Sequence, residues 1–166
     1  MGLSTAANVK FHIGTQAEVD LSTPAAAFTD FEADSYTLVG SVEDPGEFGD
    51  EVSIVTFTGL DDGRVQKFKG SRDAGDQSVV VGFDAGDAGQ QAIRDAADDT
   101  SQNDYNIKVE LNDAPVGGTP TIIYYRAKVT SYRLQPGVAD NVIRANVTLA
   151  INSALYQQDA EEGSTT

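Results

Sequence analysis

The chain has 166 residues, no cysteine, and 26 acidic against 11 basic side chains, which gives a net charge of -15. This length fits a single domain with a real hydrophobic core, and the lack of cysteine excludes a disulfide framework and a zinc site built on thiolates. Because phosphate binding needs clustered lysine and arginine, the charge argues against tight binding to nucleic acid.

The first 50 residues are acidic and weakly patterned, with nine acids and one base. Val9–Gly14 predicts a short strand, and only Tyr36–Val42 looks like a strand in the remainder. We therefore interpret residues 15–50 as a long acidic loop within the domain. A loop of this length in a compact protein is typically functional or ordered by a partner.

The middle of the chain predicts a hairpin and one further strand. Val52–Thr58 and Arg64–Lys69 read as paired strands, joined by the turn signal Asp61-Asp62-Gly63. Gln77–Phe83 predicts the next strand.

Asp84–Ala97 is the one helix candidate. Its apolar stripe is thin and consists of alanines and Ile93, and Asp84 is placed to cap its first turn. Gly86 and Gly89 weaken the helix, so we expect it to depend on packing against a sheet.

The second half contains three long stretches that alternate apolar and polar residues, at 105–111, 123–130 and 143–151. Alternate side chains on a strand point to opposite faces, so each stretch predicts a strand with one face on a core. The other faces also carry Val142, Tyr124 and Tyr132, which suggests packing against copies of the chain.

These elements predict a mainly β fold, with two packed antiparallel β-sheets in a sandwich or half-barrel flanked by one short α-helix. We expect one domain over residues 1–156, followed by a polar C-terminal tail at 157–166. No stretch is apolar enough for a signal peptide or a membrane span, so we expect a soluble protein that is made in the cytoplasm.

No catalytic or metal-binding pattern stands out. The single histidine, His12, lies on a short strand, where a structural role is the stronger interpretation than a catalytic triad. The aspartates around the helix lack the spacing of a calcium loop, and Asn146-Val-Thr148 lies within a predicted strand. We therefore expect no enzyme activity, no cofactor and no metal.

Several segments together resemble the tail tube (major tail) proteins of lambda-like siphophages. They follow in order over residues 36–156 and are Gly46-Glu-Phe-Gly49, Asp62-Gly-Arg-Val65, Lys69-Gly70, Asp73-Ala-Gly75, Asp87-Ala-Gly-Gln90, Tyr105-Asn-Ile-Lys-Val109, Ala139-Asp-Asn-Val142 and Ile151-Asn-Ser-Ala154.

The resemblance implies a structural virion protein that forms hexameric rings stacked into a hollow tail tube. It implies that the partners are further copies of the chain, a tape-measure protein, and the tail terminator and baseplate or tip proteins. Phage DNA would pass through the tube without specific binding, and an acidic wall would repel its phosphates. The location would be the virion tail, with no membrane contact.

Two sets of residues are candidates for subunit contacts. Phe48 is the one large apolar side chain of the loop 40–50 and could anchor a neighbour; the alternative is that it packs into its own core. The densest basic cluster could pair with acids of another subunit, and it contains Arg64, Lys67, Lys69 and Arg72.

Three further cations, Arg126, Lys128 and Arg144, lie on polar faces of predicted strands and could face the lumen or an interface. We expect acidic partners to neutralise them. Other roles also stay open: a tail terminator, a head decoration protein, or a carbohydrate-binding module, although tryptophan, which such modules often display, is absent.

Overall fold

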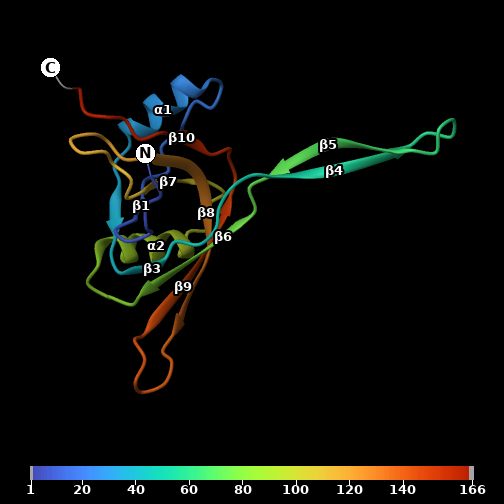
Figure 1. Cartoon of the computed structure of the whole chain (residues 1–166). Helices are drawn as coiled ribbons and strands as arrows, with labels where there is room; N and C mark the ends of the chain where they lie inside the picture. The colour runs from blue at the N-terminus through green and yellow to red at the C-terminus, as the bar shows by residue number, and fades with distance from the viewer. Residues whose placement is uncertain (1, 165–166) are drawn as a thin grey trace.

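The computed structural model describes residues 2–164. These residues form β1 (Lys10–Ile13), α1 (Pro24–Ala33), β2 (Thr37–Val39), β3 (Val42–Asp44), β4 (Glu51–Thr58), β5 (Val65–Asp73), β6 (Asp76–Gly82), α2 (Ala88–Asp98), β7 (Tyr105–Glu110), β8 (Ile122–Gln135), β9 (Arg144–Ile151) and β10 (Tyr156–Gln158), as Figure 1 shows. The predicted mainly β class with two antiparallel sheets is confirmed. The structure adds one helix to the single helix that was expected.

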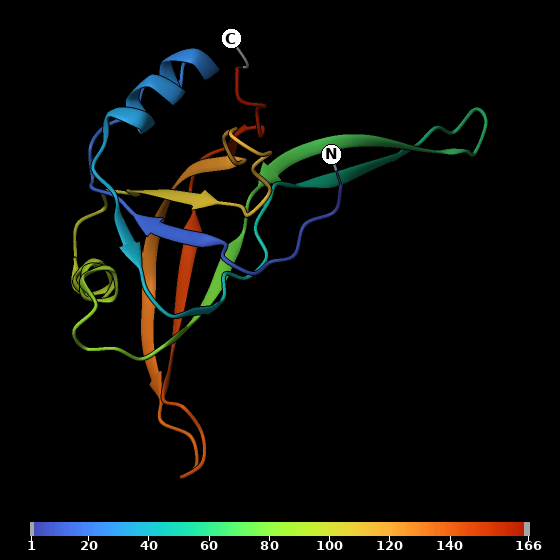
Figure 2. The same ribbon diagram turned by 60° about the vertical axis from the view of Figure 1, so that its left-hand side comes forward.

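The body of the molecule is an antiparallel sheet of eight strands in the order β2-β1-β7-β8-β9-β6-β3, with β10 beside β8. The long strand β8 pairs with β7 up to Ala127 and with β9 from Ala127 onward. β7 and β9 therefore pair with different halves of β8, and the strand direction changes between the two parts of the sheet. Figure 2 shows β1 and β7 crossing the direction of β6 and β9.

The alternating stretches bury the faces that the sequence predicts. In β9, Ala145, Val147, Leu149 and Ile151 are buried, while the residues between them are partly exposed. They join buried side chains from β1, β6, β7 and β8 in one core, which includes Tyr125. Burial of this apolar surface is the main term that stabilises the body.

Helix α2 covers part of this core through Ile93 and Ala96. It starts later than expected, because Asp87 is the N-cap and accepts a hydrogen bond from the Gln90 amide at 2.9 Å. Gly89 lets the helix approach β2 closely, since a Cβ there would lie 2.2 Å from the Leu38 carbonyl oxygen.

The interpretation of residues 15–50 as a loop is wrong over much of its length, because it contains α1, β2 and β3. Thr23 caps α1, and Pro24 occupies its first turn. The helix packs on the face of the sheet opposite the main core, where Phe31 stacks on Tyr124 at 5.3 Å between ring centroids. Tyr124 is therefore buried by its own chain, and the suggestion that a second copy covers it is wrong.

The hydrogen bonds of Asp34 hold the end of α1 to the sheet. Its carboxylate accepts from the Thr15 amide at 2.9 Å, the Thr15 hydroxyl at 2.6 Å and the Asn106 side chain at 2.8 Å. The partial burial of Asp34 raises its pKa, but these hydrogen bonds outweigh it and lower the pKa below the ordinary value.

The C-terminal segment is attached to the body. β10 pairs with the first residues of β8, and the Glu161 amide and carbonyl bond to Thr119. The predicted tail at 157–166 thus begins inside β10 and is hydrogen-bonded through Glu161; residues 165–166 lie outside the described residues. The domain limits at residues 1–156 stay a prediction.

Candidate assembly surfaces

The second sheet is a hairpin of β4 and β5 that extends from the body (Figure 1). We call residues 51–73 the arm. Its strands pair from Glu51 and Asp73 at the base to Thr58 and Val65 near the tip, with one bulge close to the base. The turn Asp61-Asp62-Gly63 forms as predicted, and Gly63 adopts the positive φ of 62° that glycine tolerates.

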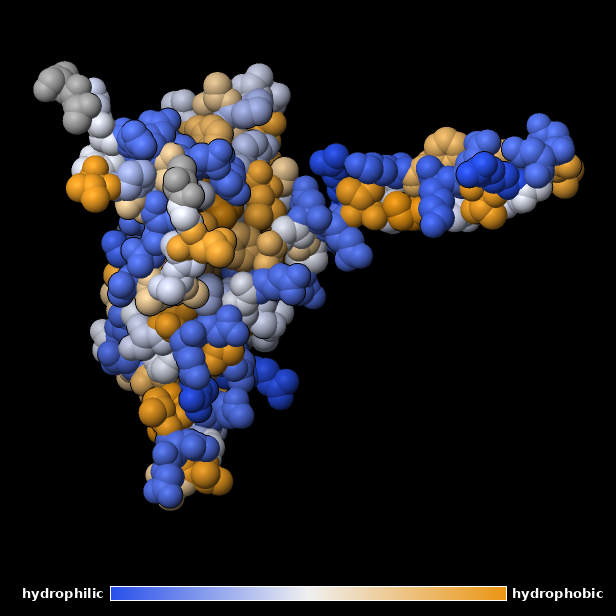
Figure 3. Space-filling model, in the orientation of Figure 1, coloured by the Kyte–Doolittle hydropathy of each residue, from blue (hydrophilic) through white to orange (hydrophobic). Residues whose placement is uncertain are grey.

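The arm exposes large apolar side chains on both faces. Because paired residues of an antiparallel ladder share a face, Val55, Phe57 and Phe68 lie together on one side. Ile54 and Val65 lie on the opposite side, and all five are at least half exposed. Figure 3 shows these apolar groups along the length of the arm, between hydrophilic ones.

The predicted basic cluster belongs entirely to the arm. Arg64 ends the turn, Lys67 and Lys69 lie on one face of β5, and Arg72 lies near its base. All four are exposed, and none makes an ion pair within residues 2–164. The arm also has four acids, so it has no net charge, and the whole net charge of -15 lies on the rest of the chain.

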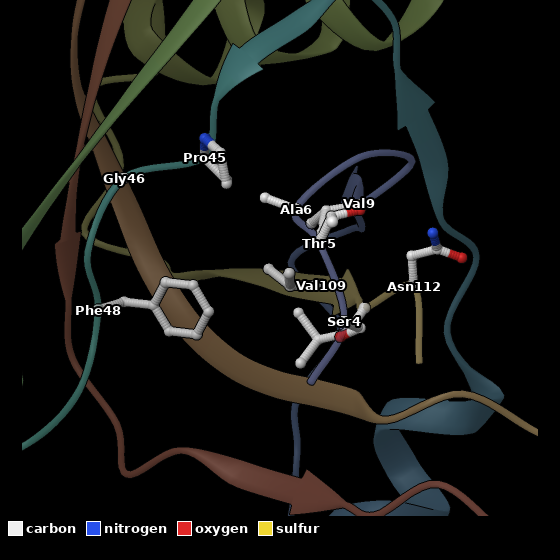
Figure 4. Close-up of a pocket in the computed structure, with 10 residues that line it drawn as sticks. Ser4, Thr5, Ala6, Val9, Pro45, Gly46, Phe48, Val109 and Asn112 are labelled. Carbon is white, nitrogen blue, oxygen red and sulfur yellow. The ribbon is translucent and has the colours of Figure 1, made fainter. Parts of the chain in front are cut away.

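Phe48 lies against its own core, which is the alternative that the sequence left open. Its ring stacks on that of Tyr125 at 5.6 Å between centroids. The ring also lines a cavity of about 310 Å³, together with Val9 and Val109 (Figure 4). This packing gives Phe48 a role in the stability of the subunit, while its role at an interface stays a prediction.

The three cations of the polar strand faces all have acidic partners in the same chain. Arg126 is nearly buried; its guanidinium lies 3.4 Å from the Glu18 carboxylate and donates to the Asp104 carbonyl at 3.3 Å. Lys128 pairs with the Asp104 carboxylate.

Arg144 pairs with Glu43 through two hydrogen bonds, the second of which is 3.1 Å long. The hydrogen bond from Arg144 lowers the pKa of the Glu43 carboxyl below its ordinary value. The expected neutralisation is therefore present inside the chain.

The remaining candidates from the sequence are His12 and the aspartates around the helix. Burial and the nearby Lys108 lower the pKa of His12, and its Nδ1 has no hydrogen-bond partner. Asp99 accepts hydrogen bonds from Ser101 and Tyr105. Among the described residues, no three acidic or histidine side chains gather in a geometry that could hold a metal ion.

Neither helix in the described part of the chain has the length and apolar character needed to cross a membrane. The exposed apolar residues of the arm were missed as candidates from sequence. Val52–Thr58 predicts a strand, and its apolar residues fall on both faces, but the sequence does not reveal that both faces of that strand are uncovered.

Solved structures of tail-like assemblies share this fold. A chain of the six-fold symmetrised baseplate of the anti-feeding prophage has a TM-score of 0.70 and 8% identity, over 96% of this chain and 97% of that chain. A chain of the PVC sheath/tube terminator, from an extracellular contractile injection system in its extended state, has a TM-score of 0.64 and 13% identity, over 95% and 98%.

A chain of the SPP1 tail tube has a TM-score of 0.58 and 17% identity, over 93% of this chain and 77% of that chain. At these identities the likeness shows a shared fold. No protein-family model and no curated protein matches the sequence.

Proposed function

We propose that this chain is a structural virion protein of a phage tail that assembles into rings stacked as a hollow tube. The fold supports this proposal, since it occurs in a baseplate, a tube terminator and a tail tube. A ring of six copies is the proposed unit, in line with the six-fold symmetry of the baseplate structure.

The observation that carries the proposal is the uncovered arm. A hairpin of two strands is at best marginally stable alone in water, and exposed apolar side chains favour contact with another surface. Six exposed large apolar side chains lie on the arm: Ile54, Val55, Phe57, Leu60, Val65 and Phe68. A second copy would cover them.

The free energy expected from covering the arm is too small to hold a ring together alone, so the assembly should have more than one interface. Covering five side chains that are about half exposed, and Leu60, which is fully exposed, contributes on the order of 6 kcal/mol. Association costs about 4–15 kcal/mol, so the arm alone reaches only the lower end of that range. Stable rings therefore need further contacts on the body, and stacking of rings needs a second kind of surface.

Charge gives a second reason for contact through the arm. Identical bodies that each carry -15 repel one another. The arm has no net charge, and its four cations make no ion pair within residues 2–164, so it can approach an acidic body. Cross-subunit pairs of Arg64, Lys67, Lys69 and Arg72 with these acids would then favour correct assembly.

The proposed lumen passes phage DNA without specific binding. Arg126, Lys128 and Arg144 pair with acids of their own chain, so these cations are less available to bind the phosphates of DNA. A tape-measure protein, a terminator and tip proteins are the further partners of a siphophage tail tube, and no catalytic role belongs to this function.

A tail terminator or a baseplate ring is the second candidate function. The PVC terminator and the baseplate chain share the fold over nearly the whole of this chain. Such a protein would form a ring that binds to the end of a tube and does not stack on itself.

Negative-stain electron microscopy of the concentrated protein tests both candidates. Stacked rings or tubes support the tail tube, and single rings support the terminator or baseplate protein. Particles that stay monomeric at every concentration would contradict both.

A further inference from the structure

The two faces of the arm differ in chemistry. Lys67 pairs with Thr56 and so lies on the same side of the ribbon, and Lys69, two residues further along β5, shares that side. Phe57 and Phe68 lie on the opposite side. The two lysines and the two aromatic rings therefore face in opposite directions.

The bulge near the base brings a third cation to the side of the lysines. Arg72 is three residues from Lys69, and in a regular strand this odd spacing would place the two side chains on opposite sides. The register shift gives β5 one extra residue against β4, so Arg72 pairs with Val52 while Lys69 pairs with Ile54. Because Val52 and Ile54 share a side of β4, Arg72 lies on the same side as the lysines.

Between the bulge and the turn, charge is confined to one side of the arm. We call the side with Lys67, Lys69 and Arg72 the cationic face, and its other side chains are all uncharged: Val52, Ile54, Thr56, Thr58 and Val65. We call the opposite side the aromatic face. Over the same length its side chains are Ser53, Val55, Phe57, Gln66, Phe68 and Ser71, with the two serine hydroxyls 3.2 Å apart. A ribbon of this kind fits two different surfaces.

The cationic face matches the charge of the body. Its three cations make no ion pair within residues 2–164, and both views show the arm extending away from its own body (Figures 1 and 2). The net charge of -15 lies entirely outside the arm. Charge complementarity therefore favours the acidic body of a second copy as the surface that covers this face.

The arm is too large for the cavities beside α2 and at the arm base. A two-stranded ribbon with the eight-residue length of β4 occupies roughly 2,500 Å³ with its side chains. These two cavities have volumes of about 600 and 640 Å³. A copy that covers the cationic face from one side therefore leaves the aromatic face open.

The aromatic face needs an apolar surface, because its exposed rings are otherwise left in water. A further copy can supply one, since four exposed large apolar side chains gather within residues 134–143, which contain a single charged residue: Leu134, Val138, Val142 and Ile143. Copies of the chain can thus cover both faces of the arm.

We propose that each arm lies between two other copies, with its cationic face on the acidic body of one copy and its aromatic face on apolar surface of the other. This inference rests on the proposed self-assembly and adds that one arm binds two subunits. In stacked rings a subunit has neighbours within its own ring and in the next one. An arm that bridges two copies couples these contacts.

Photo-cross-linking from both faces counts the copies that one arm contacts. The chain has no cysteine, so Thr56→Cys directs a benzophenone probe to the cationic face, and Gln66→Cys directs one to the aromatic face. Both positions are exposed. Tagged subunits with probes are assembled with a large excess of parent subunits and irradiated. Each single variant should give tagged dimers, and the double variant should give tagged trimers.

The salt dependence of assembly tests the acidic partner of the cationic face. We expect Lys67→Gln with Lys69→Gln to raise the critical concentration about tenfold at low salt, because two exposed ion pairs are lost. The difference from the parent chain should shrink below about twofold near 1 M salt, where charges are screened within about 3 Å. A matched control, Thr56→Gln with Thr58→Gln, changes the same face, retains the cations, and should assemble like the parent chain.

The outcomes separate this inference from the proposed function. If the double variant gives only dimers in particles that form rings or tubes, the bridging contact is overturned and the tail function stands. A lysine effect that salt does not reduce would overturn the acidic partner of the cationic face. A protein that never assembles would overturn both the inference and the proposed function.

Discussion

Replacing the two arm phenylalanines by serine tests whether the apolar face of the arm drives assembly. Phe57 and Phe68 lie on the same face and are 58% and 52% exposed. Covering the exposed half of each ring contributes about 1–1.5 kcal/mol, so the double variant loses about 2–3 kcal/mol of association free energy. The critical concentration for assembly should therefore rise roughly 30- to 150-fold.

Light scattering and sedimentation over a concentration series measure this change. A matched control, Leu3→Ser with Val116→Ser, removes two fully exposed apolar side chains outside the arm. The control should assemble like the parent chain, and the free energy of unfolding of the arm variant should stay within about 0.5 kcal/mol of the parent value, because neither ring packs in the core. An unchanged critical concentration in a folded arm variant would refute the reasoning.

Three further predictions concern charge, acid stability and Phe48. Arg64→Glu should slow assembly and leave the circular dichroism spectrum unchanged, because Arg64 is exposed and makes no ion pair with any described residue; assembly at the parent rate would remove its role. Asp34→Asn should lower the free energy of unfolding by about 1–3 kcal/mol at neutral pH, because it weakens the bonds from Thr15. The pKa of Asp34 is lowered in the folded state, so this stability is present above the ordinary pKa and is lost as the pH falls through the folded one; Asp34→Asn should flatten this loss, and an unchanged acid titration would contradict it. Phe48→Ala should lower the unfolding free energy by about 1–3 kcal/mol, because the ring stacks on Tyr125, and calorimetry showing full stability with lost assembly would instead favour the anchor role.

The alternating strands could be predicted because one physical rule decides them. β7, β8 and β9 each have one face on a single core, so period-two alternation marks them directly. Strand β8 still extends past residue 130, where the alternation weakens, because a bulge between Val129 and Ser131 shifts its register against β9.

Helix α1 could not be predicted in the same way. Its ten residues bury only Ala27 and Phe31, so it lacks the broad apolar stripe that marks a packed helix. The surface that holds it includes Tyr124, which the alternation assigns to the outer face of a strand. Only the folded chain brings these aromatic rings together.

The ion pairs of the polar strand faces join segments that are far apart in the sequence. Arg126 meets Glu18 across 108 positions of sequence, and Arg144 meets Glu43 across 101. Sequence could predict that an acidic chain would neutralise these cations, but it could not identify the partners. The uncovered state of the arm is equally a property of the whole fold, since alternation marks two faces and says nothing of what covers them.

The central claim is that the arm drives assembly, and deleting the arm tests this claim most directly. Electron microscopy should compare the full chain with a variant in which a short glycine turn replaces residues 53–71, at equal concentrations. The account predicts rings or tubes for the full chain, and a folded monomer for the variant, whose body retains its core. Equal assembly of the two proteins would contradict it.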